Sequence, residues 1–169
     1  MNWTLRISQP LLDAIRSDLR RPHRFATERA GFVFCRYGVV DRSQTLVLAH
    51  SFLPATDDDY VDDRRFGAVL GSSAWRRALT HALEHPVGIF HVHLHAHAGA
   101  PRPSRADLSE SAAFVPDFFH VRSAFPQGTL IVSNDSLSGR VWATDEAAPR
   151  SFSKLHIVGV PLQTTKGTR

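Results

Sequence analysis

Four histidines fall within seven residues, and their spacing is the feature of this sequence best suited to chemistry. Alternate residues of a β-strand point to the same face, so a strand here would carry its imidazoles on one side. Neutral imidazole is the commonest zinc ligand in proteins, and two histidines separated by one residue can reach one ion. The pattern therefore predicts a metal-binding platform. Its histidines are His91, His93, His95 and His97.

Two further sites supply the groups that a catalytic metal needs. A catalytic zinc usually keeps three protein ligands and one water, and Asp107, one turn into a helix capped by Ser104, can provide the third ligand. A histidine-rich strand that binds metal only adventitiously would leave this S-x-x-D spacing unexplained. A general base is also required, and Glu28 stands three residues before Gly31, which opens an apolar run. Glu28 gains its significance only when it is paired with the later motif.

The elements around these residues indicate an α+β fold, a mixed α/β sandwich, because strands and helices are mixed without strict alternation. A helix follows Pro10, another begins at Ser72 or Ser73 with Trp75, Leu79 and Leu83 along one stripe, and a third begins near Ser104. The acidic segment Pro54–Asp63 is expected to be an exposed, solvated loop that could contact substrate, and it lacks the spacing of a calcium loop. Strands are expected over 3–8, 31–36 (closed by Gly38), 45–52, 87–95, 128–133, 140–143 and 155–160, with a turn at Asn134-Asp135 or Ser138-Gly139.

Composition limits the class of protein. The 169 residues suffice for one domain, expected over 1–162, with a polar and frayed tail over 163–169. No apolar run approaches the roughly 20 residues that span a bilayer, no signal peptide is visible, and one cysteine excludes an intrachain disulfide. These features favour a cytoplasmic protein without a membrane partner. Cys35, among apolar neighbours, is expected to be a buried structural thiol.

Taken together, Glu28, H-x-H and S-x-x-D resemble the pattern of the JAMM (MPN-plus, JAB) zinc metalloprotease family. The resemblance implies a JAB/MPN-like, cytidine-deaminase-like central mixed β-sheet flanked by helices, and one catalytic Zn²⁺. It also implies a general base and a serine that helps to stabilise the oxyanion. The implied roles are zinc ligation by His93, His95 and Asp107, base catalysis by Glu28, and oxyanion stabilisation by Ser104.

The sequence departs from the family pattern in two ways. Ala96 stands where the family commonly has proline, and the loop to Ser104 is one residue longer. The register His95/His97 competes with His93/His95, but its loop would be one residue too short, and a tight loop is harder to shorten than to lengthen. His91 and His97 would then orient ligands or face substrate, or serve as alternative ligands.

A bacterial subgroup of the family is similar in finer detail. Its members carry HVHLH, S-x-x-D-L-S and a segment like Ser138–Trp142, and they are encoded beside ubiquitin-like, E1-like and E2-like proteins in antiphage defence operons. The resemblance implies an isopeptidase or peptidase (deubiquitinase-like) that cleaves after the C-terminus of a ubiquitin-like modifier. Its partners would be the tail of that modifier and possible E1- or E2-like proteins of the same pathway.

Three other functions stay open. The fold could serve as a non-catalytic MPN-type binding or scaffold module, although such modules typically lose the metal ligands. A DNA-repair-linked JAB family carries a string like Pro103–Asp107, but the net charge of +4 includes no basic stripe interleaved with aromatic residues, so nucleic acid is not favoured. An amidase acting on a small molecule would use the same metal site.

Overall fold

The computed structural model describes residues 2–63, 67–159 and 163–166. Within these ranges, three α-helices, one short 3-10 helix and nine strands follow one another. The helices are α1 (Gln9–Leu19), η1 (Asp57–Asp59), α2 (Ser72–Glu84) and α3 (Arg105–Phe119). The strands are β1 (Asn2–Ser8), β2 (Ala30–Asp41), β3 (Gln44–Pro54), β4 (Gly88–Leu94), β5 (Gln127–Val132), β6 (Leu137–Trp142), β7 (Arg150–Ser151), β8 (Lys154–Val158) and β9 (Gln163–Lys166).

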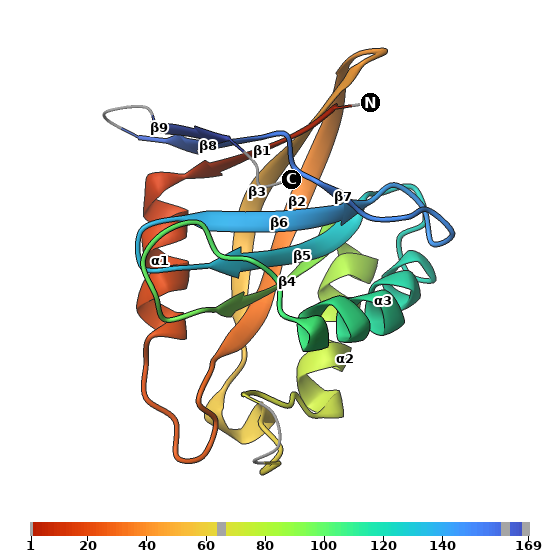
Figure 1. Ribbon diagram of the computed structural model, residues 1–169. Coiled ribbons are helices and arrows are strands. Elements are labelled where there is room, and N and C mark those ends of the chain that lie inside the picture. Colours follow the sequence, from red (N-terminus) through yellow and green to blue (C-terminus); the bar gives the residue numbers. More distant parts are fainter. Residues whose placement is uncertain (1, 64–66, 160–162, 167–169) are drawn as a thin grey trace.

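All nine strands form one sheet in the order β7-β6-β5-β4-β2-β3-β1-β8-β9. The sheet is mixed: β1 lies parallel to β3 and β8, β4 lies parallel to β5, and the remaining neighbours are antiparallel. Helix α1 covers one face, whereas α2 and α3 lie on the other (Figure 1). This arrangement confirms the α+β class and a central mixed sheet flanked by helices.

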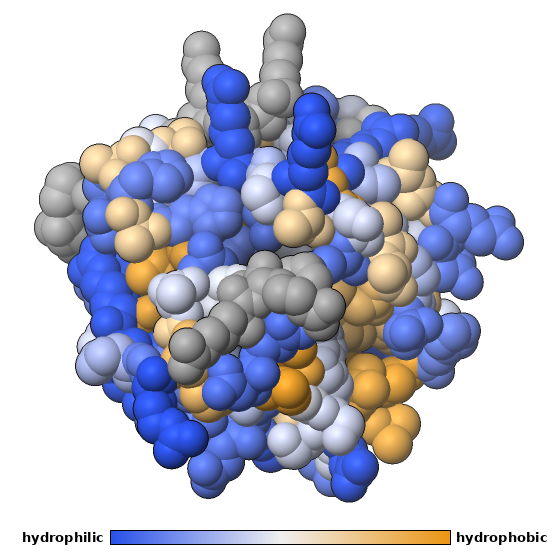
Figure 2. Space-filling model, turned by 60° about the horizontal axis from the view of Figure 1, so that its bottom comes forward, coloured by the Kyte–Doolittle hydropathy of each residue, from blue (hydrophilic) through white to orange (hydrophobic). Residues whose placement is uncertain are grey.

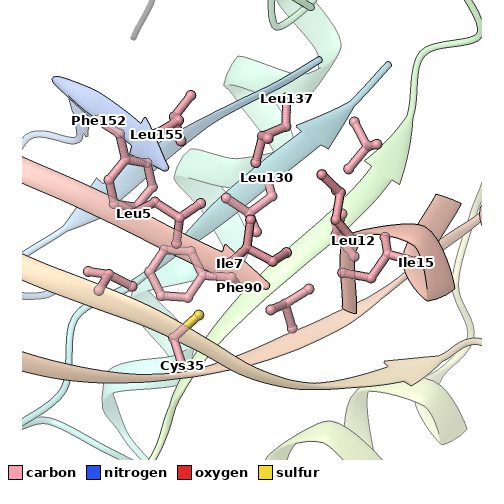
Figure 3. Close-up of a cluster of buried hydrophobic side chains, with 14 of the residues drawn as sticks. Leu5, Ile7, Leu12, Ile15, Cys35, Phe90, Leu130, Leu137, Phe152 and Leu155 are labelled. Atoms are coloured by element: carbon pink, nitrogen blue, oxygen red, sulfur yellow. The ribbon is translucent and has the colours of Figure 1, made fainter. Parts of the chain in front are cut away.

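The α1 face holds the larger apolar core. Ser8 caps α1, and Leu12, Ile15 and Leu19 of this helix are buried against the sheet. Figure 3 shows Leu12 and Ile15 converging with side chains from β1, β2, β4, β5 and β6. Cys35 belongs to this core, so its prediction as a buried thiol is confirmed, and burial raises the pKa of the thiol well above its usual range.

The opposite face is packed by α2 and α3, and here two expectations were wrong. The residues of α2 buried on the sheet are Ala74, Ala78 and Ala82, whereas Leu83, expected on one apolar stripe with Trp75 and Leu79, is 64% exposed. Small alanines let the helix approach the sheet closely, while Trp75 and Leu79 are partly buried at its flank. The residue that caps the helix is Gly71 rather than a serine.

The acidic segment is more ordered than its composition suggests. Asp59, expected to be solvated, is 3% exposed, and both of its carboxylate oxygens accept hydrogen bonds from Arg77, at 2.7 and 2.6 Å. This hydrogen bonding lowers the pKa of Asp59 well below its usual range. Asp57 forms an ion pair with the buried Arg29 at 2.7 Å. The prediction of an exposed, solvated loop was therefore wrong for Asp59, which is buried against Arg77, whereas Asp57, Asp58 and Asp62 are exposed.

Some strands end at other residues than predicted, because backbone pairing with a neighbouring strand extends beyond the side-chain pattern. Strand β2 continues past Gly38 to Asp41 in a long hairpin with β3, and the tight turn after β5 lies at Ser133–Ser136, which leaves Ser138 and Gly139 within β6. Residues 163–166, expected to be a frayed tail, form β9 along the open edge of β8. Strand pairing needs only the backbone, so a polar segment can occupy such an edge.

The surface has the mixed character of an ordinary globular domain. On the face shown in Figure 2, hydrophilic residues are interspersed with smaller hydrophobic groups. None of the helices in the described ranges is both long and apolar enough to cross a bilayer.

Candidate metal centre

Strand β4 and the turn after it bring His93 and His95 together. His93 is the sixth residue of β4, and His95 follows its end, where the backbone N–H of His95 still donates to the carbonyl of Val132 at 2.9 Å. The two Nε2 atoms are 3.2 Å apart. Two ring nitrogens at this distance can both reach one metal ion.

Helix α3 carries Asp107 to the same point. Ser104 caps the helix, as predicted: its hydroxyl accepts from the N–H of Asp107 at 3.1 Å, and its own N–H donates to the Asp107 carboxylate at 2.6 Å. One carboxylate oxygen lies 3.3 Å from Nε2 of His93, and the other lies 3.4 Å from Nε2 of His95. Donors about 2.0–2.1 Å from a tetrahedral ion are separated by about 3.3 Å, so these spacings fit one ion.

Glu28 completes the cluster from the other side. Ala30, at the start of β2, is paired with His93, so the residues that lead into β2 lie beside the end of β4. The ligand atoms of Glu28, His93 and His95 lie within 4.8 Å of one another, which makes the three a possible metal-binding triad. The structure thus brings together all four residues that the sequence singled out as ligands or base.

The position of Glu28 is fixed by neighbours that the sequence did not reveal. Its backbone N–H donates to the carbonyl of Gly67 at 3.1 Å, and a Cβ added to Gly67 would lie 2.9 Å from the Glu28 carboxylate. Next along the chain, buried Arg29 is held by Asp57, and the Tyr60 hydroxyl accepts from the N–H of Ala30 at 2.8 Å. These contacts anchor the entry to β2 and aim the carboxylate at the histidines.

Electrostatics favour the protonation states that a metal requires. Although burial opposes it, the hydrogen bonds from His93 and from Ser104 hold the pKa of Asp107 well below its usual range. Burial, with a smaller contribution from His93, lowers the pKa of His95. An ionised carboxylate and neutral imidazoles are the forms that bind divalent metals, so the donor chemistry fits the zinc ion expected from the sequence.

The two outer histidines behave differently from the central pair. His91 is enclosed by aromatic rings: it is stacked on Trp75 with 5.7 Å between centroids and lies edge-on to Phe32 and Phe114. This burial lowers its pKa to about 3. His97 is exposed, and its Nδ1 lies 2.8 Å from the carbonyl oxygen of Ala98. The geometry therefore groups His93 with His95, and it places His91 beside them as a packed neighbour.

The long loop between His95 and Ser104 is held by hydrogen bonds to the turn after β5. Gly99 has a φ of 88°, a conformation that favours glycine. Its N–H donates to Asp135 at 2.7 Å, and its carbonyl accepts from the Ser133 hydroxyl at 2.7 Å. The extra residue of this loop is therefore accommodated by the β5–β6 turn.

A cavity of about 820 Å³ opens over the cluster. Its wall includes Glu110, one turn after Asp107 on α3, and burial together with the neighbouring acids raises the pKa of Glu110. The i, i+3 spacing to Asp107 could have identified this residue from the sequence. The segment Gly67–Leu70 also lines the cavity, whereas Pro54–Asp63, expected to face substrate, does not.

Comparisons with known proteins leave the family open. No protein-family model matches the chain, and no curated protein matches it. Among solved structures, the N-terminal domain of STIL from Trichoplax adhaerens matches with a TM-score of 0.38 and 12% identity, over 81% of this chain and 40% of that one. This chain therefore spans less than half of that matched structure, and a likeness of this size carries no functional argument.

Proposed function

We propose that this protein is a zinc-dependent isopeptidase or peptidase of the JAMM type. The observation that carries the proposal is the cluster of donors at the end of β4, where Nε2 atoms of His93 and His95 and the two oxygens of Asp107 are separated by 3.2–3.4 Å. Glu28 stands beside them, with a carboxylate oxygen within 4.8 Å of the ligand atoms of both histidines. A scaffold module would gain nothing from this convergence.

The residues divide the chemistry of amide cleavage among them. Zinc bound by His93, His95 and Asp107 would polarise the substrate carbonyl and lower the pKa of a water molecule at the site. Glu28 takes a proton from that water and later delivers it to the departing amine nitrogen. The Ser104 hydroxyl accepts from the N–H of Asp107 and also hydrogen-bonds the Asp107 carboxylate. When substrate binds, this hydroxyl would turn its hydrogen towards the developing oxyanion.

The proposed substrate is the C-terminal tail of a ubiquitin-like modifier, joined to a lysine or extended as a precursor, within a bacterial pathway with E1- and E2-like partners. This assignment rests on the sequence resemblance. The cavity supports it by its lining: Gly67–Leu70 forms part of the wall together with Glu28, and an extended peptide could lie along this segment.

Zinc content per chain, measured by elemental analysis of purified protein, tests the proposal. We expect one zinc in the wild type and none in His95→Ala or Asp107→Ala. Glu28→Ala should keep its zinc but lose cleavage of fusions that carry a ubiquitin-like C-terminus, by about 10²–10⁴-fold. A folded wild type that takes up no zinc would overturn the proposal. Loss of zinc in Glu28→Ala would instead make Glu28 a ligand, as the 4.8 Å triad allows.

A further inference from the structure

A second cavity, of about 390 Å³, adjoins the first on the side of β5 and β6. The two cavities share Pro103, Thr129, Ile131 and Arg140 in their walls. Their charges differ, because the first contains the acids Glu28, Asp107 and Glu110 and the second contains no acid. The polar residues that line the second cavity are Arg102, Arg140, Thr129, Ser138 and Ser151.

The sheet register fixes where Arg140 lies relative to the metal donors. Thr129 of β5 pairs with His91 of β4 on one side and with Arg140 of β6 on the other. Residues directly opposite each other in a sheet share a face, so Arg140 lies on the face that carries His91 and His93. Two strand spacings separate β6 from β4, which is about 10 Å. A group bound at Arg140 would thus be a few bonds from a carbonyl at the metal donors.

Arg140 is unlike the other partly buried arginines. Arg16 and Arg122 donate to backbone carbonyls, and Arg29 and Arg77 bind carboxylates. Among the described residues, the guanidinium of Arg140 has no hydrogen bond or ion pair, and it lies over the ring of Trp142, 5.3 Å from the guanidinium carbon to the ring centroid. Partial burial of a guanidinium without an acceptor is unfavourable and lowers the pKa of Arg140. The Trp142 ring packs against the Arg140 guanidinium and leaves its N–H groups available as hydrogen-bond donors.

We propose that the second cavity is a subsite for a carboxylate of the substrate, bound by Arg140 with help from Arg102 and the nearby hydroxyls. A guanidinium presents a planar fork that matches a carboxylate in two parallel hydrogen bonds. This inference rests on the proposed function, and it narrows the substrate class to amides with a negative charge close to the scissile bond. That charge can be the free α-carboxylate of the lysine released, or an acidic side chain beside it.

Binding to metal-free protein tests the subsite separately from catalysis, and it avoids carboxylate binding to the metal. The probes are lysines acylated on Nε with acetyl-Gly-Gly. One has a free α-carboxylate, one has an α-carboxamide, and one has the carboxamide replaced by an aspartate residue that is itself amidated. Dissociation constants come from NMR titration. At least one acidic probe should bind about tenfold or more tightly than the carboxamide, because charge-assisted hydrogen bonds are strong.

Variants test whether Arg140 and Arg102 cause the preference for an acidic probe. Arg140→Gln should remove the preference for the acidic probe, and Arg102→Gln, at an exposed position, should reduce it. Arg105→Gln is the matched control, since Arg105 begins α3 but lines neither cavity. A preference confined to the α-carboxylate probe would identify a free amino acid or C-terminus as the source, and one confined to the aspartate probe an acidic side chain.

Two results would overturn the subsite. One is equal binding of all three probes to the wild type. The other is an equal loss in Arg140→Gln and Arg105→Gln, which would reflect general positive charge. Neither result bears on zinc content, so failure of the subsite and failure of the metal centre are separate outcomes.

Discussion

The two faces of β4 and β5 show how one pair of strands serves both folding and chemistry. Towards α1, the two strands present Phe90, Val92, Leu94, Leu130 and Val132, each at most 6% exposed. Towards α3, the same strands present His91, His93, Thr129 and Ile131, beside an open cavity. Alternation of side chains across a strand makes this division possible.

The difference teaches that the site depends on a core that it does not share. The α1 face closes over tightly packed apolar groups, which fixes the register of β4 against β2 and β5. The α3 face then holds polar groups whose spacing is set by that register. Substitutions on the first face should affect stability, and substitutions on the second should affect metal binding and rate.

The largest difference between the two faces is expected when Leu130→Ala is compared with His93→Ala: the first should lose stability, and the second should lose zinc. Leu130 is 1% exposed, so its truncation should lower the free energy of unfolding by about 2–5 kcal/mol while the folded fraction keeps its zinc. His93→Ala should lose zinc but change the stability of the metal-free protein by less than about 1.5 kcal/mol, since the cavity admits water. Urea unfolding of metal-free samples, with zinc analysis alongside, measures both effects. Equal destabilisation by the two variants would show that the faces are not independent.

A smaller effect, on catalytic rate alone, is expected from a substitution of Gly67, which lies against the Glu28 side chain. A Cβ at position 67 would displace the end of the Glu28 side chain, which can move at little cost in stability. Gly67→Ala should therefore keep its zinc and its melting temperature but reduce kcat/KM by about 10–100-fold, as a misplaced base would. Gly38→Ala is the matched control, because nothing lies within 4 Å of its added Cβ. Full activity in Gly67→Ala would mean that the carboxylate position is not critical.

The sequence predicted most elements of the fold, because their signals are local. The histidine alternation, the Ser104 cap and the apolar spacing of α1 depend on residues close in sequence. The wrong predictions concern residues whose burial depends on partners far away in the sequence. Leu83 faces solvent because small alanines provide the contact surface of α2, and Asp59 is buried because Arg77 of that helix pairs with it.

The residues of the site also fall into two groups, those that the sequence predicts and those that it does not. Its central residues could be recognised from spacing, and the structure brings Glu28, His93, His95 and Asp107 together. The role of Gly67 and the place of Arg140 could not be recognised, because they depend on a loop that folds back on Glu28 and on the register of β6. Neither relation leaves a pattern in the sequence.

The smallest effect on stability concerns His91, which lines the cavity but is partly buried between the rings of Trp75, Phe32 and Phe114. Its aromatic enclosure lowers its pKa to about 3, whereas an unfolded histidine titrates near 6.5. Between these values the unfolded chain binds the extra proton, so His91 makes stability fall as the pH falls below about 6.5. From pH 7 to pH 5 the loss should be roughly 1–2 kcal/mol.

His91→Phe retains an aromatic ring and removes the titration, so its metal-free stability should fall less over the same range. Urea unfolding of the wild type and the variant at pH 7, 6 and 5 measures the difference. The range ends above the region where Asp107, with its own lowered pKa, would add a further loss at lower pH. Parallel curves for the two proteins would mean that water reaches His91, and the polar face of β4 would then be solvated up to its middle.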